Sequence, residues 1–228
     1  MNISNIQVDL LKGLSEGTVP LPSGWLSGFE VAVLYTSVIA LKANTAILEV
    51  GSWIGRSSCV LAYAVRDKCP TKVRFDIVDY GITGSDEWMQ RFGSSVFEHS
   101  DAKALCEVVF AAGGTIAKLK QNLVDRGISQ FVTQITLGDV ADFASHVKYE
   151  LIFCDATHDE SEIRKNIPIL ASHLSSDFIL ICDDIHTEEH CKLISDLVGA
   201  EQGYMCNKSD VYCDFALLTK GRYNGFLG

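Results

Sequence analysis

The chain has 228 residues, a length that suits one α/β domain, and 47% of them are hydrophobic, enough for a sizeable core. Charged residues make up 21%, which argues against a disordered chain. The 29 acidic residues outnumber the 19 lysines and arginines, giving a net charge of −10. Because such a chain repels phosphate groups, nucleic acid is not expected as a partner.

The eight cysteines include no C-x-x-C pair, which weakens a zinc or thioredoxin-like interpretation. The first residues lack the basic region and the apolar stretch of a signal peptide. No apolar run approaches the roughly 20 residues that a membrane-spanning helix needs. We therefore expect a reduced, cytoplasmic protein with no membrane contact, and the sequence leaves a homo-oligomer open.

The first predicted elements form an N-terminal helical segment over residues 1–45. Within it, glycines and prolines mark Gly17–Gly28 as a loop, and the apolar spacing of Phe29–Lys42 is helical. From residue 46 onward, apolar runs typical of strands alternate with helical patterns. The predicted strands are Ala46–Val50, Val73–Tyr80, Phe131–Leu137, Tyr149–Asp155, Asp177–Asp183, Tyr204–Lys208 and Val211–Thr219. The predicted helices among them are Arg56–Lys68, Glu160–Leu174 and Glu188–Val198.

Residues 81–127 form a predicted helical insertion that is longer than an ordinary crossover between strands. Its helical pieces are Ser85–Phe97, Ala102–Ala112 and Thr115–Arg126. Insertions at the ligand edge often form a lid or a substrate wall. The side chains that offer an apolar surface for this are Trp88, Met89, Phe92 and Phe97. A local helical core is the competing interpretation, and we favour it.

This alternation predicts a single α/β domain over residues 1–228, with a Rossmann-like, mainly parallel sheet of about seven strands and helices on both faces. Parallel strands that are buried on both faces form continuous apolar runs, as in the segments LIFCD and FILICD. The last two strands are joined by too short a connection for a parallel crossover, so we expect them to be antiparallel.

A glycine-rich turn follows the first predicted strand, in the sequence EVGSWIGRSS from residue 49 to 58. Ligands bind at the carboxyl ends of strands in parallel α/β sheets. Gly51 lets the chain turn sharply and approach a ligand, Gly55 lets the next helix start close by, and Ser57 and Ser58 can cap that helix. The spacing G-x-x-x-G departs from the G-x-G-x-x-G of nicotinamide-binding turns, and a plain strand-to-helix turn is the competing interpretation.

Two later strand ends also carry acidic residues. Asp79 ends the second predicted strand, where a carboxylate can hydrogen-bond ribose hydroxyls, and Gly138-Asp139 follows the third strand. In this order, the turn and the two acidic strand ends resemble the class I S-adenosylmethionine-dependent methyltransferases over about residues 20–220. The resemblance implies that the turn around Gly51 lines the methionine part of the cofactor, Asp79 holds the ribose and Asp139 approaches the adenine amino group. The cofactor-binding residues it implies are Glu49, Gly51, Ser52, Gly55, Ser57, Asp79, Gly138 and Asp139.

A narrower resemblance rests on Gly24-Trp25-Leu26-Ser27 and on the turn with the sequence GSWIGRS. Both are similar to segments of small-molecule methyltransferases, a group that includes the macrolide-sugar O-methyltransferases and the cephalosporin-biosynthesis relatives. This resemblance implies a small-molecule methyl acceptor. Trp25 and Trp53 lie beside the turn and can cover cofactor or substrate, although burial in a core is the commoner outcome for an aromatic residue.

Carboxylates also follow the fourth and fifth predicted strands. If these strands are neighbours, Asp155, Asp183 and Asp184 meet at one edge of the sheet and repel one another unless they are protonated or bridged by a cation. Oxygen ligands of this kind suit Mg²⁺, Ca²⁺ or Mn²⁺. An ion bound to two adjacent substrate oxygens lowers the pKa of the hydroxyl that is to be methylated.

His158, three residues after Asp155, is the predicted base that takes the hydroxyl proton. Catechol-type O-methyltransferases resemble this pattern, with a basic residue three positions after their first metal-binding Asp, and the macrolide-sugar enzymes have a histidine there. The resemblance implies a metal site at Asp155, Asp183 and Asp184. Each residue alone also has an ordinary interpretation, because an Asp can cap the following helix and a His can lie on the surface.

The leading interpretation is therefore a methyltransferase that uses S-adenosylmethionine and a divalent metal, Mg²⁺, to methylate a small-molecule hydroxyl. Three alternatives stay open: a methyltransferase without a metal, a cofactor-binding protein without methyl transfer, and a nicotinamide oxidoreductase, against which the missing G-x-G-x-x-G argues. The methyl acceptor itself cannot be read from the sequence. His186 is expected at the rim of the pocket, and His190 in solvent.

Overall fold

Seven strands form one sheet in a computed structural model that describes residues 5–68, 73–84, 112–156, 159–208 and 213–226. The strands are β1 (Ala46–Val50), β2 (Arg74–Asp79), β3 (Gln134–Leu137), β4 (Tyr149–Cys154), β5 (Leu174–Asp183), β6 (Gln202–Lys208) and β7 (Cys213–Lys220). Their order is β3-β2-β1-β4-β5-β7-β6, and β7 alone runs antiparallel to its neighbours β5 and β6. The predicted Rossmann-like α/β fold with an antiparallel final pair is therefore confirmed.

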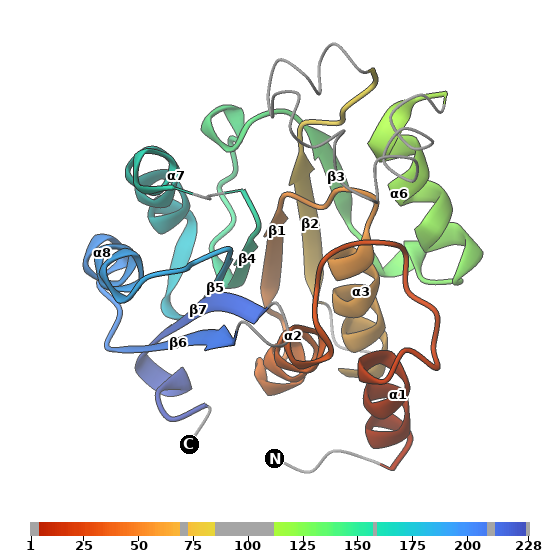
Figure 1. Cartoon of the computed structure of the whole chain (residues 1–228), viewed down its shortest axis with the longest axis horizontal. Coiled ribbons are helices and arrows are strands. Elements are labelled where there is room, and N and C mark those ends of the chain that lie inside the picture. Colours follow the sequence, from red (N-terminus) through yellow and green to blue (C-terminus); the bar gives the residue numbers. More distant parts are fainter. Residues whose placement is uncertain (1–4, 69–72, 85–111, 157–158, 209–212, 227–228) are drawn as a thin grey trace.

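Helices cover both faces of this sheet (Figure 1). The helices are α1 (Asn5–Ser15), α2 (Gly28–Ala40), α3 (Arg56–Lys68), α6 (Gly114–Asp125), α7 (Glu160–His173) and α8 (Glu188–Val198). Short 3₁₀ turns are η2 (Ser129–Phe131), η3 (Val140–Asp142) and η4 (Gly221–Tyr223). The helices α7 and α8 lie on one side of the sheet, and α2, α3 and α6 lie on the other.

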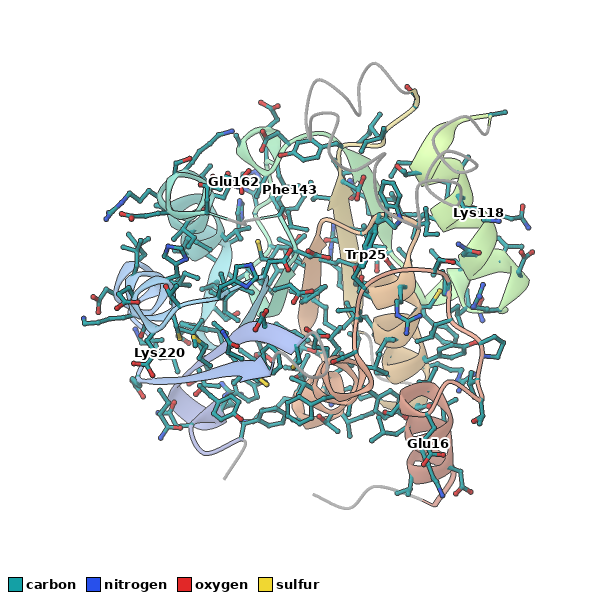
Figure 2. All side chains as sticks on the ribbon, viewed as in Figure 1. Glu16, Trp25, Lys118, Phe143, Glu162 and Lys220 are labelled. Carbon is teal, nitrogen blue, oxygen red and sulfur yellow. The ribbon has the colours of Figure 1, made fainter. Side chains whose placement is uncertain are left out.

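Strand side chains alternate between two hydrophobic cores. Ile47 of β1 and Ile77 of β2 point into the core shared with α2, α3 and α6. Leu48 and Val78 point into the core shared with α7 and α8. Side chains fill both layers between sheet and helices (Figure 2). This two-sided burial explains why the central strands are continuous apolar runs in the sequence.

Several predicted boundaries differ from the observed ones by one to three residues. Leu174 belongs to β5 rather than to the preceding helix, because it adopts an extended backbone with ψ of 145° and its N–H bonds to the carbonyl of Ala171. The strand β3 begins at Gln134 rather than at Phe131, because Ser129–Phe131 turn as a 3₁₀ helix.

The structure describes only part of the predicted insertion at 81–127. Its last predicted helix, Thr115–Arg126, is observed as α6. The predicted helix Ser85–Phe97 and all but the last residue of Ala102–Ala112 lie outside the described residues. The same holds for the proposed apolar surface of Trp88, Met89, Phe92 and Phe97.

The strand order reverses at β1, which lies between β2 and β4. In open α/β sheets, ligands bind in the crevice beyond the carboxyl ends of the strands at such a switch point. The segments that border this crevice are the turn after β1 and the ends of β2, β4 and β5, and these segments hold most of the predicted site residues.

Candidate active site

The turn after β1 brings three backbone segments close together. Gly51 adopts φ of +82°, and its N–H donates to the carbonyl of Val78 at 3.0 Å. A Cβ atom on Gly51 would lie 2.0 Å from the backbone oxygen of Asp155, so no side chain fits. Glycine is thus required at this position by the backbone conformation and by the close approach of the chain beyond β4.

Glu49 lies beneath the turn. It is fully buried and accepts hydrogen bonds from the hydroxyls of Ser57 and Ser58, the latter at 2.6 Å. Burial raises the pKa of Glu49 to about 8, although both hydroxyl hydrogen bonds act in the opposite direction. The two serines, expected to cap α3, instead tie this helix to the end of β1.

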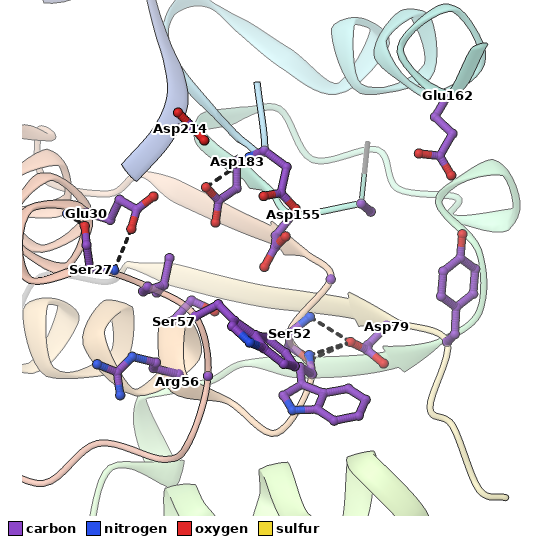
Figure 3. Close-up of a pocket in the computed structure, with 18 of the residues that line it drawn as sticks. Ser27, Glu30, Ser52, Arg56, Ser57, Asp79, Asp155, Glu162, Asp183 and Asp214 are labelled. Atoms are coloured by element: carbon purple, nitrogen blue, oxygen red, sulfur yellow. Dashed lines mark hydrogen bonds between the residues drawn. The ribbon is translucent and has the colours of Figure 1, made fainter. Parts of the chain in front are cut away.

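Asp79, at the end of β2, anchors the turn. Its Oδ2 accepts hydrogen bonds from the Ser52 N–H at 2.7 Å, the Ser52 hydroxyl at 3.0 Å and the Trp53 N–H at 2.9 Å (Figure 3). Its Oδ1 accepts a hydrogen bond from the N–H of Gly81 at 2.8 Å. These bonds hold Trp53 at φ of +50°, which side chains rarely adopt. Asp79 therefore has a structural role in addition to the cofactor contact that the sequence predicts.

A cavity of about 680 Å³ opens at this edge of the sheet, beside the ends of β1, β2, β4 and β5. This volume lies in the usual range for small-molecule sites. The predicted site residues that line the cavity are Gly51, Ser52, Ser57, Asp79, Asp155, Asp183 and Asp184. The fold therefore brings seven of the twelve predicted residues to one surface.

Four predicted cofactor residues do not line this cavity: Glu49, Gly55, Gly138 and Asp139. Gly55 has φ of +92°, and a Cβ atom there would lie 2.4 Å from the Leu119 side chain, so it allows α3 and α6 to pack closely. Asp139 accepts a hydrogen bond from the N–H of Ala141 at 3.0 Å and lies 3.3 Å from the ammonium group of Lys165.

The predicted base His158 lies outside the described residues, so its role stays a prediction. Another histidine, His186, does line the cavity. Its Nδ1 lies 3.2 Å from Oδ2 of Asp214, and its carbonyl accepts a hydrogen bond from the Asn207 amide at 3.0 Å.

The three aspartates expected to bind metal come from adjacent strands. Cys154 pairs with Cys182 in the parallel ladder, so the next residues, Asp155 and Asp183, leave the sheet side by side. Burial and the neighbouring Asp184 raise the pKa of Asp155 well above its usual range, and burial and Asp155 do the same for the pKa of Asp183. A cation between these carboxylates would relieve their repulsion.

Helix capping does not explain these aspartates. The cap of α7 is Asp159, which accepts a hydrogen bond from the N–H of Glu162 at 2.9 Å. The cap of α8 is Thr187, which accepts from the N–H of His190 at 3.1 Å. The competing expectation of capping by the strand-end aspartates is therefore wrong.

Oxygen donors of this kind fit a hard divalent cation. Among the residues that the structure describes, no three His, Cys, Asp or Glu side chains are grouped closely enough to hold a metal ion as they stand. A cation at Asp155, Asp183 and Asp184 therefore requires these side chains to draw together. Water and substrate oxygens commonly complete such a coordination shell.

Sequence reasoning missed three carboxylates of the cavity, Glu30, Glu162 and Asp214. Glu30 closes a capping box with Ser27, whose N–H donates to Oε2 of Glu30 at 2.5 Å. The spacing Ser-x-x-Glu is a signal for the start of α2, but it carries no information about a cavity. Asp214 reaches the site because β7 pairs antiparallel with β5, so that Phe215 lies opposite Asp183.

Two tryptophans form an aromatic wall of the cavity. The ring centroids of Trp25 and Trp53 are 6.0 Å apart, and Trp25 is 63% exposed. The loop that carries Trp25 is held by Arg56, whose Nη1 donates to the carbonyl of Pro22 at 2.9 Å. Trp25 is thus a surface residue at the mouth of the cavity rather than part of the core.

A seven-stranded sheet of this order, with a glycine-rich turn and acidic strand ends around a cavity at its switch point, is typical of class I methyltransferases. A family profile described as a methyltransferase domain matches residues 48–185. The chain therefore belongs to this methyltransferase family, and it is an S-adenosylmethionine-dependent methyltransferase. No curated protein matches the chain significantly.

Solved methyltransferase structures share the fold. An O-methyltransferase from Bacillus cereus in complex with S-adenosylhomocysteine (SAH) is 14% identical with a TM-score of 0.55, and the match covers 97% of this chain and 93% of that one. TomG from Streptomyces achromogenes, an O-methyltransferase involved in tomaymycin synthesis and bound to S-adenosylmethionine, is 15% identical with a TM-score of 0.53, covering 96% and 92%. The N-methyltransferase NodS from Bradyrhizobium japonicum is 12% identical with a TM-score of 0.51, covering 85% and 96%.

At these identities the likeness shows the fold alone, and proteins of this fold methylate different acceptor atoms. Within the part of the chain that the structure describes, no helix is long and apolar enough to cross a membrane.

Proposed function

We propose that the protein transfers a methyl group from S-adenosylmethionine to a hydroxyl of a small molecule, assisted by a divalent cation such as Mg²⁺. The observation that carries this proposal is the meeting of Asp155, Asp183 and Asp184 in the same cavity as the glycine-rich turn. Burial, and after it the mutual repulsion of the carboxylates, raises the pKa of Asp155 and of Asp183, and both effects favour a bound cation. The solved O-methyltransferases of this fold support an oxygen acceptor.

On the cofactor side, we assign direct contacts to Gly51, Ser52, Ser57 and Asp79, because these four line the cavity. The missing side chain at Gly51 lets the turn pack against the backbone of Asp155, beside the cavity. Glu49 and Gly55 support the turn from beneath, since one binds the serines of α3 and the other permits close packing of α6. Gly138 and Asp139 remain predicted contacts for the adenine end.

On the acceptor side, Asp155, Asp183 and Asp184 would hold the cation. When bound, the cation lowers the pKa of a coordinated substrate hydroxyl and so makes it a better nucleophile. His158 remains the predicted group that removes the proton. The exposed face of Trp25 and the ring of Trp53 limit the access of water to the reacting atoms.

The test is methylation of catechol by S-adenosylmethionine, measured as SAH formation with Mg²⁺ and again with chelator. We expect activity that needs the metal, and a loss of about a hundredfold or more in Asp155→Asn and Asp183→Asn, since metal assistance is worth several kcal/mol. Both variants should still bind S-adenosylmethionine in calorimetry, because neither residue is assigned to the cofactor. The exposed Asp196→Asn, paired with Lys192 on α8, is the matched control.

Methyl transfer without a metal is the second candidate, because no three described side chains enclose an ion as they stand. Full activity of both variants in chelator would select it. Tight cofactor binding with no transfer to any acceptor would instead indicate a cofactor-binding protein of the same fold.

A further inference from the structure

The hairpin of β6 and β7 contains a close pair of cysteines. The sulfur atoms of Cys206 and Cys213 are 3.1 Å apart. Cys206 pairs with Phe215 in the antiparallel ladder, so Cys213 is its diagonal neighbour on the same face of the sheet. Both side chains belong to the core shared with α2. A disulfide bond is about 2 Å long, so the two sulfurs need to approach each other by only about 1 Å.

The position of this pair at the border of the sheet lets reactants reach it. Each of the two side chains is at most 1% exposed, so an oxidant can reach the sulfurs only when β6 separates from β7. The strand β6 is the outermost strand of the described sheet (Figure 1), and its residues Gln202, Gly203 and Tyr204 are exposed. Elements with little burial open at a smaller free energy than core strands do. The pair can therefore react without unfolding of the whole protein.

A second pair of neighbouring cysteines provides the contrast. Cys154 and Cys182 are partners in the parallel ladder of β4 and β5. Both are buried in the core shared with α7 and α8, and their strands lie in the middle of the sheet. Because a reactant can reach these sulfurs only if the core is broken, we expect this pair to remain reduced.

The closed hairpin also keeps the pair unreactive. Burial, and after it the contact with Cys206, raises the pKa of Cys213 to about 12. The thiolate is the nucleophile in thiol–disulfide exchange, and Cys213 is therefore protonated at neutral pH while the hairpin is closed. Exchange must then proceed through the opened hairpin, and the edge position of β6 decides which pair reacts.

We propose that Cys206 and Cys213 are a reversible redox pair, which a low-molecular-weight disulfide such as oxidised glutathione converts into an intramolecular disulfide. The thiolate of one cysteine attacks a sulfur of oxidised glutathione, forms a mixed disulfide and releases one glutathione. The second cysteine then attacks the protein sulfur of the mixed disulfide, forms the Cys206–Cys213 bond and releases the second glutathione. The two electrons and two protons of the cysteine thiols thus pass to the two glutathione molecules.

The bond ties the outermost strand to the strand that forms part of the cavity. Asp214, which follows Cys213 on β7, lines the cavity. Closing the short loop between the two cysteines removes conformations of the unfolded chain and opposes separation of β6 from β7. Oxidation therefore stabilises the hairpin that carries Asp214, whichever acceptor the enzyme methylates.

The test starts from the folded, reduced protein, which is incubated with millimolar oxidised glutathione and quenched with acid. Remaining thiols are then alkylated in denaturant, and the chain is digested with trypsin. Trypsin cleaves after Lys208, so Cys206 and Cys213 fall in separate peptides, 193–208 and 209–220, with one cysteine each. In mass spectra we expect these peptides to be joined in at least about half of the molecules within hours, and to separate after treatment with dithiothreitol.

The central pair is the internal control in the same digest. Cys154 lies in peptide 149–164 and Cys182 in peptide 166–192, and these two peptides should remain separate. Joining of the two control peptides at the rate of the hairpin peptides would overturn the inference, because the edge position of the hairpin would then have no effect.

The matched variants are Cys206→Ala and Cys213→Ala, each of which should abolish the link. Oxidation should raise the melting temperature of the natural protein by about 5 °C or more, and that of neither variant. Comparing oxidised with reduced samples of the same protein cancels any structural effect of the substitution itself.

Three further outcomes would contradict the inference. The first is the absence of joined hairpin peptides after a day, and the second is glutathione attached to Cys206 or Cys213 without a link between them. The third is a link that leaves the melting temperature unchanged, because such a bond does not close the hairpin. All three are read on the natural protein, so the inference stays testable even if a variant does not fold.

Discussion

At Gly51, both the backbone conformation and the close packing of a neighbouring chain segment exclude any side chain. An alanine there meets both the strain of φ at +82° and the carbonyl oxygen of Asp155 at 2.0 Å. We expect Gly51→Ala to lower the free energy of unfolding by about 4 kcal/mol or more and to abolish cofactor binding. Gly127 is the matched control, since it has φ of +64° with no atom within 4 Å of an added Cβ.

For Gly127→Ala we expect a loss of only about 1–2 kcal/mol, the cost of the left-handed conformation alone, and unchanged cofactor affinity. Urea unfolding and calorimetry with S-adenosylmethionine measure both effects. Equal losses of stability and of cofactor affinity in the two variants would show that the close contact with Asp155 does not explain the effect of Gly51→Ala.

Glu49 is a single residue that makes the free energy of unfolding depend on pH. Its pKa is raised from 4.5 to about 8 by burial, so folding favours the protonated acid. The contribution of Glu49 to stability is complete below about pH 4.5 and is lost as pH rises through about 8. In Glu49→Gln, whose amide resembles the protonated acid, this loss should disappear.

We therefore expect Glu49→Gln to be more stable than the natural protein at pH 8, by roughly a few kcal/mol, and nearly equal to it at pH 4.5. Urea unfolding at both pH values measures the difference. Glu49→Ala, which leaves Ser57 and Ser58 without an acceptor, should instead be destabilised at both. A Glu49→Gln variant with the same pH dependence as the natural protein would refute the assignment.

At the scale of elements, the loop between α1 and α2 forms one wall of the cavity. Its backbone is held by two arginines, Arg56 at the carbonyl of Pro22 and Arg126 at the carbonyl of Pro20. Replacing both arginines with methionine removes two charge-assisted hydrogen bonds that are worth about 1 kcal/mol each or more.

We expect the Arg56→Met and Arg126→Met double variant to be cleaved faster within residues 16–27 and to bind S-adenosylmethionine several-fold more weakly. Limited proteolysis and calorimetry measure these effects. The control is Arg164→Met, which breaks an exposed pair with Glu160 on α7. If cleavage and affinity match the control, the loop does not depend on its arginine contacts.

At the scale of the whole molecule, cofactor binding should stabilise the fold, because the cavity joins the ends of four strands and the start of α2. A ligand at a hundred times its Kd contributes about 2.7 kcal/mol to stability. For a domain of this size, the melting temperature should then rise by roughly 5–10 °C. Gly51→Ala should show no rise, and no rise in the natural protein would contradict the cofactor site.

The sequence by itself determined the alternation of strands and helices. Continuous apolar runs such as LIFCD predict strands that are buried on both faces of the sheet. It also determined the turn at Gly51 and the acidic strand ends, because glycine is the residue that most readily adopts a positive φ and because strand ends in a parallel sheet meet at one edge. The alternation of elements, the turn and the strand ends depend on neighbouring residues or on the order of the strands, so the sequence pattern can predict them. The sequence did not determine boundaries such as the one at Leu174, whose apolar side chain fits the end of a helix as well as the start of a strand.

Only the tertiary structure decided what each polar residue does at that edge. Asp79 binds the backbone of the turn at Ser52, 27 positions away, a contact that forms only in the folded sheet. Glu49 lies beneath the turn because β1 and the start of α3 pack together there. Glu30 and Asp214 enter the cavity through the packing of α2 and the antiparallel pairing of β7 with β5. The positions of Glu30 and Asp214 in the cavity cannot be predicted from residue spacing, because the packing of the whole core sets the geometry between distant segments.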